Sequence, residues 1–452
     1  MSDTAILTLR TMLANLDDAK KYQSLRDVMS TLPAPDLAAV FEDLPPEKLP
    51  VLFRLCPKDL AAEIFAELTP ETQQDLIDGL TDKELKAVVD DLFVDDATDL
   101  VEEMPANVVK KVLQNADEGT RKTINQFLNY PENSAGSLMT IEYVDLHDYF
   151  TVRKAMDYIR RTGIDKETVY TCYVIDDQRK LVGQVSLRKL IIAPESACIR
   201  DIMDTNIVSA VTTDDQEAVA DDFRRYDLTS VAVCDKENRL VGIITIDDIV
   251  DVIQDENTED IKKMAAIIPS DEDYMKTSVW SLVAHRLPWL MLLMISATFT
   301  STIITHFETL LSGAVLLTAF IPMLMDSAGN SGSQTSVTVI RNLALGEIEL
   351  RDWPRVLIKE IGVAVVSGAA LALVNFLRII IFTNTSMMIA AVVSVTLFCT
   401  VIIAMIVGCL LPIGAKKLGF DPAVMASPMI TTIVDACSLM IYFLIASTML
   451  GL

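Results

Sequence analysis

Long uncharged runs in the second half of the chain constrain its fold more than any other feature. Residues 379–415 contain no Asp, Glu, Lys or Arg over 37 positions, and residues 287–307 contain none over 21. A helix of about 20 apolar residues crosses the hydrocarbon core of a membrane. With similar runs nearby, these stretches predict an α-helical integral membrane domain with five transmembrane helices, at about 286–307, 313–340, 356–382, 387–412 and 423–450.

Charge separates this membrane part from an acidic first part. Residues 276–452 carry nine basic and eight acidic side chains, whereas residues 1–275 carry 29 and 55, a net charge of −26. So acidic a domain repels phosphate, which argues against a nucleic-acid partner. The N-terminal residues show no apolar signal core, so we expect the first part to stay in the cytosol.

Basic residues are divided unevenly among the loops between the predicted spans. The loops at 308–312 and 383–386 hold none, whereas the other two loops hold five Lys and Arg between them, and Lys359 follows directly in the first turn of the third span. Basic loops favour the cytosolic side of a membrane. We therefore expect a multi-pass protein of the cell (inner or plasma) membrane, with its N-terminus in the cytosol and its C-terminus outside.

The sequence offers little for enzyme chemistry. Seven cysteines form no C-x-x-C pair, and three histidines add few soft metal ligands. A nucleophile–base set, a Walker loop and a dinucleotide fingerprint are all missing, so we expect no enzyme activity.

Asp435 lies near the middle of the fifth predicted span. A carboxylate at that depth is costly and is a functional candidate by default. It belongs to a polar stripe at steps of three or four residues, which Thr432 flanks and which consists of Ser427, Thr431, Asp435, Ser438 and Tyr442. Hydroxyls alone would indicate helix packing, but the carboxylate favours a face toward water or an ion.

The second predicted span contains the segment from Pro322 to Thr335, which is rich in glycine and polar residues. Gly329 and Gly332 permit a close approach of another helix, whereas Asp326, Asn330 and Gln334 supply oxygen atoms. Carboxylate, amide and carbonyl oxygens are hard ligands, which suit Mg²⁺ or Ca²⁺ rather than soft metals.

The acidic first part shows two kinds of repeat. Residues 33–115 read as short helices that begin every 10 to 13 residues near a Pro or Asp, which predicts an α-solenoid. Farther along, KLVGQVSLRKLI at 180–191 aligns with RLVGIITIDDIV at 239–250, an offset of 59 residues. With the segments before them, these repeats show the β-α-β-β-α pattern of paired α/β CBS domains.

A dense acidic segment follows the second repeat. Residues 247–260 hold seven carboxylates and no basic residue, and Asp251, Asp255 and Glu259 recur every four positions. Like charges at that spacing destabilise a helix, and a divalent cation would reverse the effect. A merely solvated helix face is the plain alternative to a gating linker.

The motif P-x-x-x-x-x-x-G-N-x-G-x-Q at 322–334, together with DPAVMASPMITTIVD at 421–435, resembles the MgtE family of magnesium channels. The resemblance covers nearly the whole chain. It implies a homodimer in the lipid bilayer with a pore at the dimer axis. It also implies that Asp435 binds hydrated Mg²⁺ there, with Thr431, Thr432, Ser427 and Asn330 around it; we add Asp326 and Gln334 as pore candidates.

The same resemblance implies that cytosolic carboxylates sense Mg²⁺ and shut the pore. The candidate regulatory residues are Asp95, Asp99, Glu217, Asp227, Asp248, Asp251, Asp255, Glu256, Glu259 and Asp260. CBS pairs often bind an adenine nucleotide such as ATP, for which the candidates are Thr245, Asp247 and Arg188. A structural pair without nucleotide is an equal alternative.

These predictions divide the chain into five parts: an acidic helical-repeat domain at 1–135, CBS domains at 136–198 and 199–250, an acidic connecting helix at 251–280, and the transmembrane domain at 281–452. The predicted function is a channel or transporter that moves Mg²⁺ into the cytosol and is closed by cytosolic Mg²⁺. Two alternatives remain: a divalent-cation carrier coupled to H⁺ or Na⁺, and a membrane-tethered metal or nucleotide sensor that transports nothing.

Overall fold

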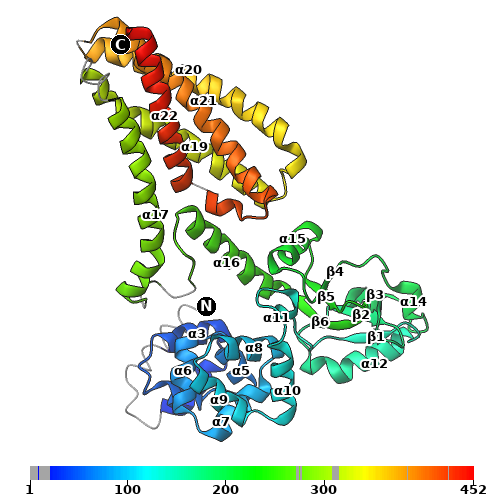
Figure 1. Ribbon diagram of the computed structural model, residues 1–452. Coiled ribbons are helices and arrows are strands. Elements are labelled where there is room, and N and C mark those ends of the chain that lie inside the picture. The colour runs from blue at the N-terminus through cyan, green and yellow to red at the C-terminus, as the bar shows by residue number, and fades with distance from the viewer. Residues whose placement is uncertain are drawn as a thin grey trace. The chain divides into compact units, whose positions relative to one another are not determined.

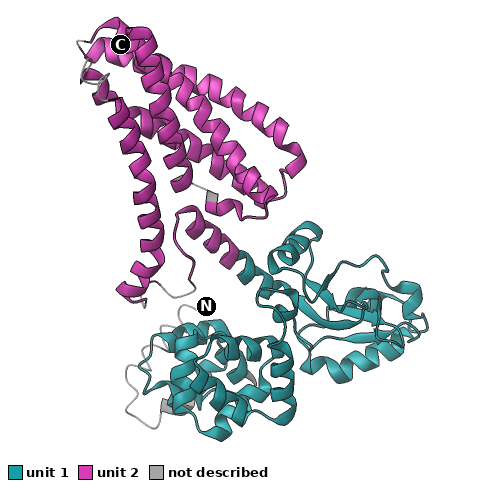
Figure 2. Ribbon diagram, viewed as in Figure 1, with its two compact units in different colours: residues 1–253 teal, residues 254–452 magenta. Residues whose placement is uncertain are grey.

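The computed structural model describes residues 9, 21–270, 274, 277–307, 315–383, 385–425 and 427–451. The chain divides into two compact units, residues 1–253 and 254–452 (Figure 2).

The first unit begins with a run of short helices that pack around one apolar core. They begin close to the predicted positions, because proline or a capping side chain marks most of the starts; Thr81, for example, forms a capping box with Glu84. The helices are α2 (Lys21–Met29), α3 (Ala34–Glu42), α4 (Leu49–Phe53), α5 (Lys58–Ala66), α6 (Pro70–Gly79), α7 (Asp82–Asp91), α8 (Val94–Glu103), α9 (Ala106–Asn115) and α10 (Glu118–Phe127).

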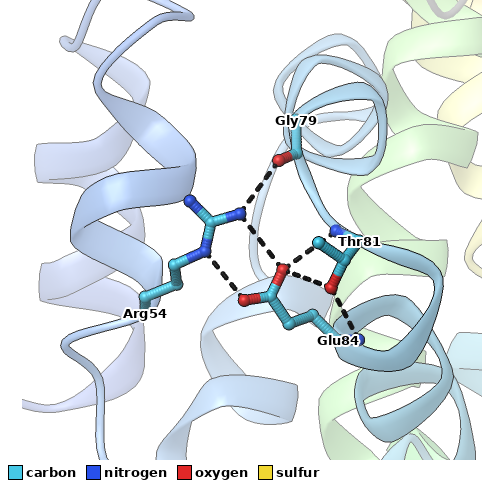
Figure 3. A network of polar contacts seen from close by, with 4 residues as sticks. All are labelled: Arg54, Gly79, Thr81 and Glu84. Atoms are coloured by element: carbon cyan, nitrogen blue, oxygen red, sulfur yellow. Dashed lines mark hydrogen bonds and ion pairs between the residues drawn. The ribbon is translucent and has the colours of Figure 1, made fainter.

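A polar network joins α4 to the junction of α6 and α7 (Figure 3). The Arg54 guanidinium donates to Glu84 Oε1 at 2.8 Å and to the Gly79 carbonyl at 3.2 Å. Glu84 also accepts from the backbone and hydroxyl of Thr81. The hydrogen bond from Arg54, with those from Thr81, lowers the pKa of Glu84 to about 2.

Two similar α/β repeats follow in the same unit. In each, the first strand is parallel to the second and the second is antiparallel to the third, which gives the sheets β1-β2-β3 and β4-β5-β6. Their elements are α11 (Ala135–Leu138), β1 (Asp145–His147), α12 (Val152–Thr162), η1 (Gly163–Asp165), β2 (Thr171–Ile175), β3 (Leu181–Ser186), α13 (Leu187–Ile192), α14 (Ile199–Ile202), β4 (Ser209–Val211), α15 (Gln216–Tyr226), β5 (Ser230–Cys234) and β6 (Leu240–Thr245).

The acidic segment after β6 forms one helix of 19 residues, α16 (Ile246–Met264), which crosses the boundary between the two units. The helix expected over 251–280 therefore starts earlier, and α16 ends at Met264. Its end is set by Ala266, which has a positive φ of 56°, and by a hydrogen bond from the Ile267 N–H to the Lys262 carbonyl.

The second unit is built from long helices (Figure 1). Within it, α19 packs against α21 and α22, α20 packs against α21, and α17 packs against α22. The elements are α17 (Val279–His306), η2 (Val315–Phe320), α19 (Ile321–Ala344), η3 (Leu350–Asp352), α20 (Trp353–Phe382), α21 (Met387–Lys417), η4 (Pro422–Met425) and α22 (Ser427–Leu450).

Four of the described helical segments are long and apolar enough to cross a membrane: residues 279–306, 350–382, 387–417 and 428–450. The helix at the second predicted span, α19, is 24 residues long but more polar. The start expected near 313 lies outside the described residues; from Val315 the chain forms the short η2 helix, and α19 starts at Ile321 with Pro322 in its first turn. The first predicted span begins earlier than expected, at Val279, and the fifth begins later, at Ser427.

Glycines allow α19 to pack closely against α21 and α22, as the sequence predicted for Gly329 and Gly332. A Cβ atom added to Gly408 of α21 would lie 2.3 Å from the Gly332 carbonyl oxygen. A Cβ at Gly332 would lie 2.9 Å from Ile430 Cγ2 of α22. These contacts let the backbones approach closely, so the polar helix α19 is covered by protein on one side.

Candidate ion pathway and regulatory carboxylates

Asp435 lies on α22 beside the glycine-rich segment of α19. A Cβ at Gly329 would lie 4.0 Å from Asp435 Oδ1 and 3.1 Å from Thr431 Cγ2. Asp435 is half-buried and interacts electrostatically with Asp326 of α19. The fold thus brings together two acids that are 109 positions apart in the sequence.

The polar side of α19 continues from Asp326 along the helix. Asp326, Asn330 and Gln334 follow one another at steps of four, so they share one helix face, and all three are exposed on the single chain. This face presents one carboxylate and two amide groups, which offer oxygen ligands for a hydrated cation.

Hydroxyl groups continue the candidate pathway on α22. Thr431 and Thr432 both donate to the Pro428 carbonyl, at 2.9 and 3.0 Å, which leaves their oxygen lone pairs available as acceptors. Ser427 begins the helix, but its side chain lies outside the described residues.

The predicted polar stripe does not extend past Asp435. Ser438 is 2% exposed, and Tyr442 is fully buried and donates from its hydroxyl to the Leu317 carbonyl at 2.9 Å. These two side chains stabilise helix packing, so their assignment to an ion-facing stripe is wrong. In the part of the chain that the structure describes, no three His, Cys, Asp or Glu side chains are placed to hold a metal ion together.

A second group of carboxylates gathers in the first unit, between α8, α16 and two loops. Its members interact electrostatically with one another. We call it the acid cluster; it comprises Glu67, Asp95, Asp96, Asp99, Glu142, Glu167, Asp247, Asp248 and Asp251.

Burial and mutual repulsion raise the pKa values in the acid cluster. Burial, then repulsion by Glu67 and Asp247, raises the pKa of Asp96 to about 6. Burial, then the neighbouring carboxylates, raises the pKa of Glu167 and of Asp99 to about 7 each, although Asp99 still reaches solvent. The pKa of Asp95 is raised well above its usual value for the same reasons. Charge compensation by a cation would relieve this repulsion.

Sequence reasoning found only part of this cluster. It named Asp95, Asp99, Asp248 and Asp251, and Asp96 belongs to the same acidic tract on α8. By contrast, Glu142 and Glu167 lie outside the acidic tracts of α8 and α16 and join the cluster only through folding. Two other predicted sensors, Glu217 and Asp227, lie at the two ends of α15, and both are exposed.

The three residues predicted for nucleotide binding have different surroundings. Thr245 is buried and donates from its hydroxyl to Asp248 Oδ2 at 3.0 Å. Asp247 belongs to the acid cluster, whose negative charge would repel a phosphate group. Arg188 is exposed on α13 of the other repeat.

The end of α16 contacts the connection between α21 and α22. Lys263 Nζ lies 2.6 Å from Glu259 Oε1 and 2.7 Å from Asp421 Oδ2. Burial, followed by repulsion from Asp421, raises the pKa of the nearby Asp260. Asp255 is exposed and Glu256 is half-buried on the same helix.

Comparison with known proteins agrees with this architecture. The sequence model of a family described as "Divalent cation transporter" matches residues 321–445, that of the "MgtE intracellular N domain" matches 32–133, and the CBS domain matches 135–196 and 199–255. Proteins named magnesium transporter MgtE from Thermus thermophilus and Bacillus subtilis are 35% and 32% identical, over 95% and 94% of both chains. The chain belongs to the MgtE family.

Solved structures resemble the cytosolic part of this MgtE-family chain. The cytosolic domain of the Mg²⁺ channel MgtE in complex with ATP is 35% identical, with a TM-score of 0.51, and the match covers 55% of this chain and 99% of that one. The soluble part of a magnesium transporter is 28% identical, with a TM-score of 0.53, over 57% and 99%. Together with the four long apolar helices of the second unit, these matches and the family models confirm the predicted fold class: apolar helices combined with a helical-repeat domain and a CBS pair. The family is one of transporters rather than enzymes.

Proposed function

We propose that this chain conducts Mg²⁺ into the cytosol and that cytosolic Mg²⁺ closes it. The observation that carries the proposal is the position of Asp435 beside Gly329 and within electrostatic range of Asp326, among helices apolar enough to span a membrane. A carboxylate kept in such surroundings marks an ion pathway. The names of the similar proteins support Mg²⁺ as the ion.

The ion pathway requires a second copy of the chain in this proposal. One chain offers a single polar wall, made of Asp435 with Thr431 and the exposed face at Asp326, Asn330 and Gln334. A two-fold axis would supply the opposite wall from the same residues. The homodimer would lie in the cell membrane with the acidic N-terminal part in the cytosol and the C-terminus outside, as the basic loops favour.

Carboxylate repulsion provides the proposed gate. Without Mg²⁺, the acid cluster and the acids of α16 repel and favour an open state. Bound Mg²⁺ neutralises them and favours a closed state, so the ion shifts an equilibrium between two states according to its different affinity for each. The proposed regulatory positions remain those predicted from sequence, with Glu67, Asp96, Glu142 and Glu167 added.

Nucleotide binding is a further part of the proposal. A relative whose cytosolic domain was crystallised with ATP supports an adenine nucleotide in the CBS pair. Thr245, Asp247 and Arg188 remain the sequence candidates, and a phosphate at Asp247 would need an accompanying cation because of the surrounding carboxylates.

Mg²⁺ uptake into liposomes containing the purified chain tests the proposal. Asp435→Asn preserves the shape of the side chain and should lower Mg²⁺ uptake at least about tenfold, with an unchanged dimer on size-exclusion chromatography. Glu347→Gln, at an exposed position outside the helices, is the control and should keep normal uptake. Normal uptake by Asp435→Asn would remove Asp435 from the pathway, and uptake that requires an imposed H⁺ or Na⁺ gradient would indicate a coupled carrier.

A further inference from the structure

We infer that Lys263 is a positioning residue that couples α16 to the ion-pathway helix α22 by holding the end of α16 on the connection before that helix. The inference rests on the proposed function, since it assigns a role in gating. It concerns only the second unit, because Lys263, its partners and α22 all belong to residues 254–452.

Lys263 lies between two carboxylates of different origin. Glu259 is one helical turn earlier on α16, whereas Asp421 is 158 positions later in the chain, and the distances to them are 2.6 and 2.7 Å. The side chain of Lys263 is only 25% exposed. The pair with Glu259 fixes the direction of the lysine side chain, and the pair with Asp421 connects separate parts of the fold.

Asp421 passes this contact on toward α22. Its Oδ2 atom meets Lys263, while its Oδ1 atom accepts a hydrogen bond from the Ala423 N–H at 2.8 Å. Ala423 belongs to the 3-10 turn η4, and α22 begins at Ser427, two residues after η4 ends. One carboxylate thus joins the end of α16 to the turn that leads into the helix of Asp435.

A second contact connects α16 to the other candidate pathway helix. Arg341 of α19 donates to Asn257 Oδ1 of α16 at 3.2 Å. A polar contact therefore links α16 to α19 directly, and an ion pair links α16 to the connection that leads into α22.

The ammonium group performs part of the task that the proposed gate gives to Mg²⁺. It places a positive charge between Glu259 and Asp421, and it does so at any Mg²⁺ concentration because it is attached to the chain. A lysine ammonium group carries a positive charge at physiological pH. Its two ion pairs therefore favour the docked position of α16.

Replacing Lys263 in the full-length protein tests the inference. Lys263→Met should raise the cytosolic Mg²⁺ concentration for half-inhibition about fivefold, the change that roughly 1 kcal/mol produces, with unchanged maximal flux at low Mg²⁺. Lys263→Arg should restore the normal value. The control is Lys262→Met, because Lys262 donates a hydrogen bond to the Ser270 carbonyl, which is not part of the connection before α22.

A charge exchange and a readout without flux complete the test. Lys263→Glu combined with Asp421→Lys should recover inhibition that either single change impairs. Proteolysis at residues 265–270, titrated with Mg²⁺, should show the same shift in protection for Lys263→Met. Two results overturn the inference. If Lys263→Met left the Mg²⁺ concentration for half-inhibition unchanged, the contact would be a surface ion pair without a role in gating. If that concentration fell, Lys263 would compete with Mg²⁺ in the wild type. The two hypotheses can fail separately. If the wild-type chain passed no Mg²⁺, but Lys263→Met still shifted the Mg²⁺ dependence of protection from proteolysis, transport would be refuted and the coupling would stand.

Discussion

Asp96→Asn is a sensitive test of repulsion in the acid cluster, because it removes one charge at nearly constant volume. Asp96 is half-buried on α8, where burial and the carboxylates of Glu67, Asp247 and Glu142 raise its pKa from 3.8 to about 6. An acid whose pKa is higher in the folded state binds more protons there than in the unfolded state. Its charge therefore destabilises the fold as pH rises from about 4 through 6, and the destabilisation is complete at pH 8.

The magnitude follows from the size of the pKa shift. Each pKa unit corresponds to about 1.4 kcal/mol, so the shift sets an upper bound of about 3 kcal/mol, and solvent screening of a half-buried group lowers this to about 1–2 kcal/mol. At pH 8 without Mg²⁺, Asp96→Asn should therefore stabilise the cytosolic unit by about 1–2 kcal/mol. At pH 4 the difference should nearly vanish, because Asp96 is then protonated in the wild type.

Thermal unfolding of residues 1–264, which keep α16 whole, measures the effect. The expected rise in Tm at pH 8 is about 2–8 °C for a protein of this size. Adding Mg²⁺ should stabilise the wild type more than Asp96→Asn, because the variant has less repulsion for the ion to relieve. Asp78→Asn, at an exposed position on α6, is the control and should change Tm little at either pH.

Two results would refute this reasoning. If the Tm difference between Asp96→Asn and the wild type were the same at pH 4 and pH 8, its cause would be packing rather than charge. If Mg²⁺ stabilised both proteins equally, Asp96 would have no part in the response to the ion.

Three further changes test other parts of the structure. The first removes four charges from α16 together, by Asp251→Asn, Asp255→Asn, Glu256→Gln and Glu259→Gln. It should flatten the Mg²⁺ dependence of open probability in patch recordings and leave the channel mainly open. An unchanged Mg²⁺ dependence would indicate a solvated helix. Gly408→Ala should reduce the yield of folded membrane protein on size-exclusion chromatography severalfold, since its Cβ would lie 2.3 Å from the Gly332 carbonyl oxygen. A normal yield would mean that α19 and α21 can move apart at a small cost in free energy. Arg54→Met should destabilise the helical-repeat domain by about 1 kcal/mol at pH 7 in urea unfolding. This difference in stability should fade as acid protonates Glu84 between about pH 4.5 and 2. A difference that persists in acid would assign the effect to packing.

Features that depend on neighbouring residues could be predicted from the sequence. Uncharged runs located the apolar helices, because membrane insertion depends on the hydropathy of consecutive residues. The offset of 59 residues between the two repeats predicted two copies of one strand and helix pattern, and the two sheets have the same order. Asp435 could be predicted as a functional residue because the sequence alone shows a charged residue within a long apolar run.

Features that depend on contacts between distant residues were decided only by the tertiary structure. The sequence pattern assigned Tyr442 to the polar stripe, but packing places its hydroxyl on the Leu317 carbonyl. Glu167 lies far in the sequence from the acidic tracts of α8 and α16, and it becomes part of the acid cluster because folding brings these helices to it. Lys263 and Asp421 form an ion pair across 158 positions. Periodicity and hydropathy describe which face of an element is apolar, whereas the partner of a polar side chain depends on how separate elements pack in three dimensions.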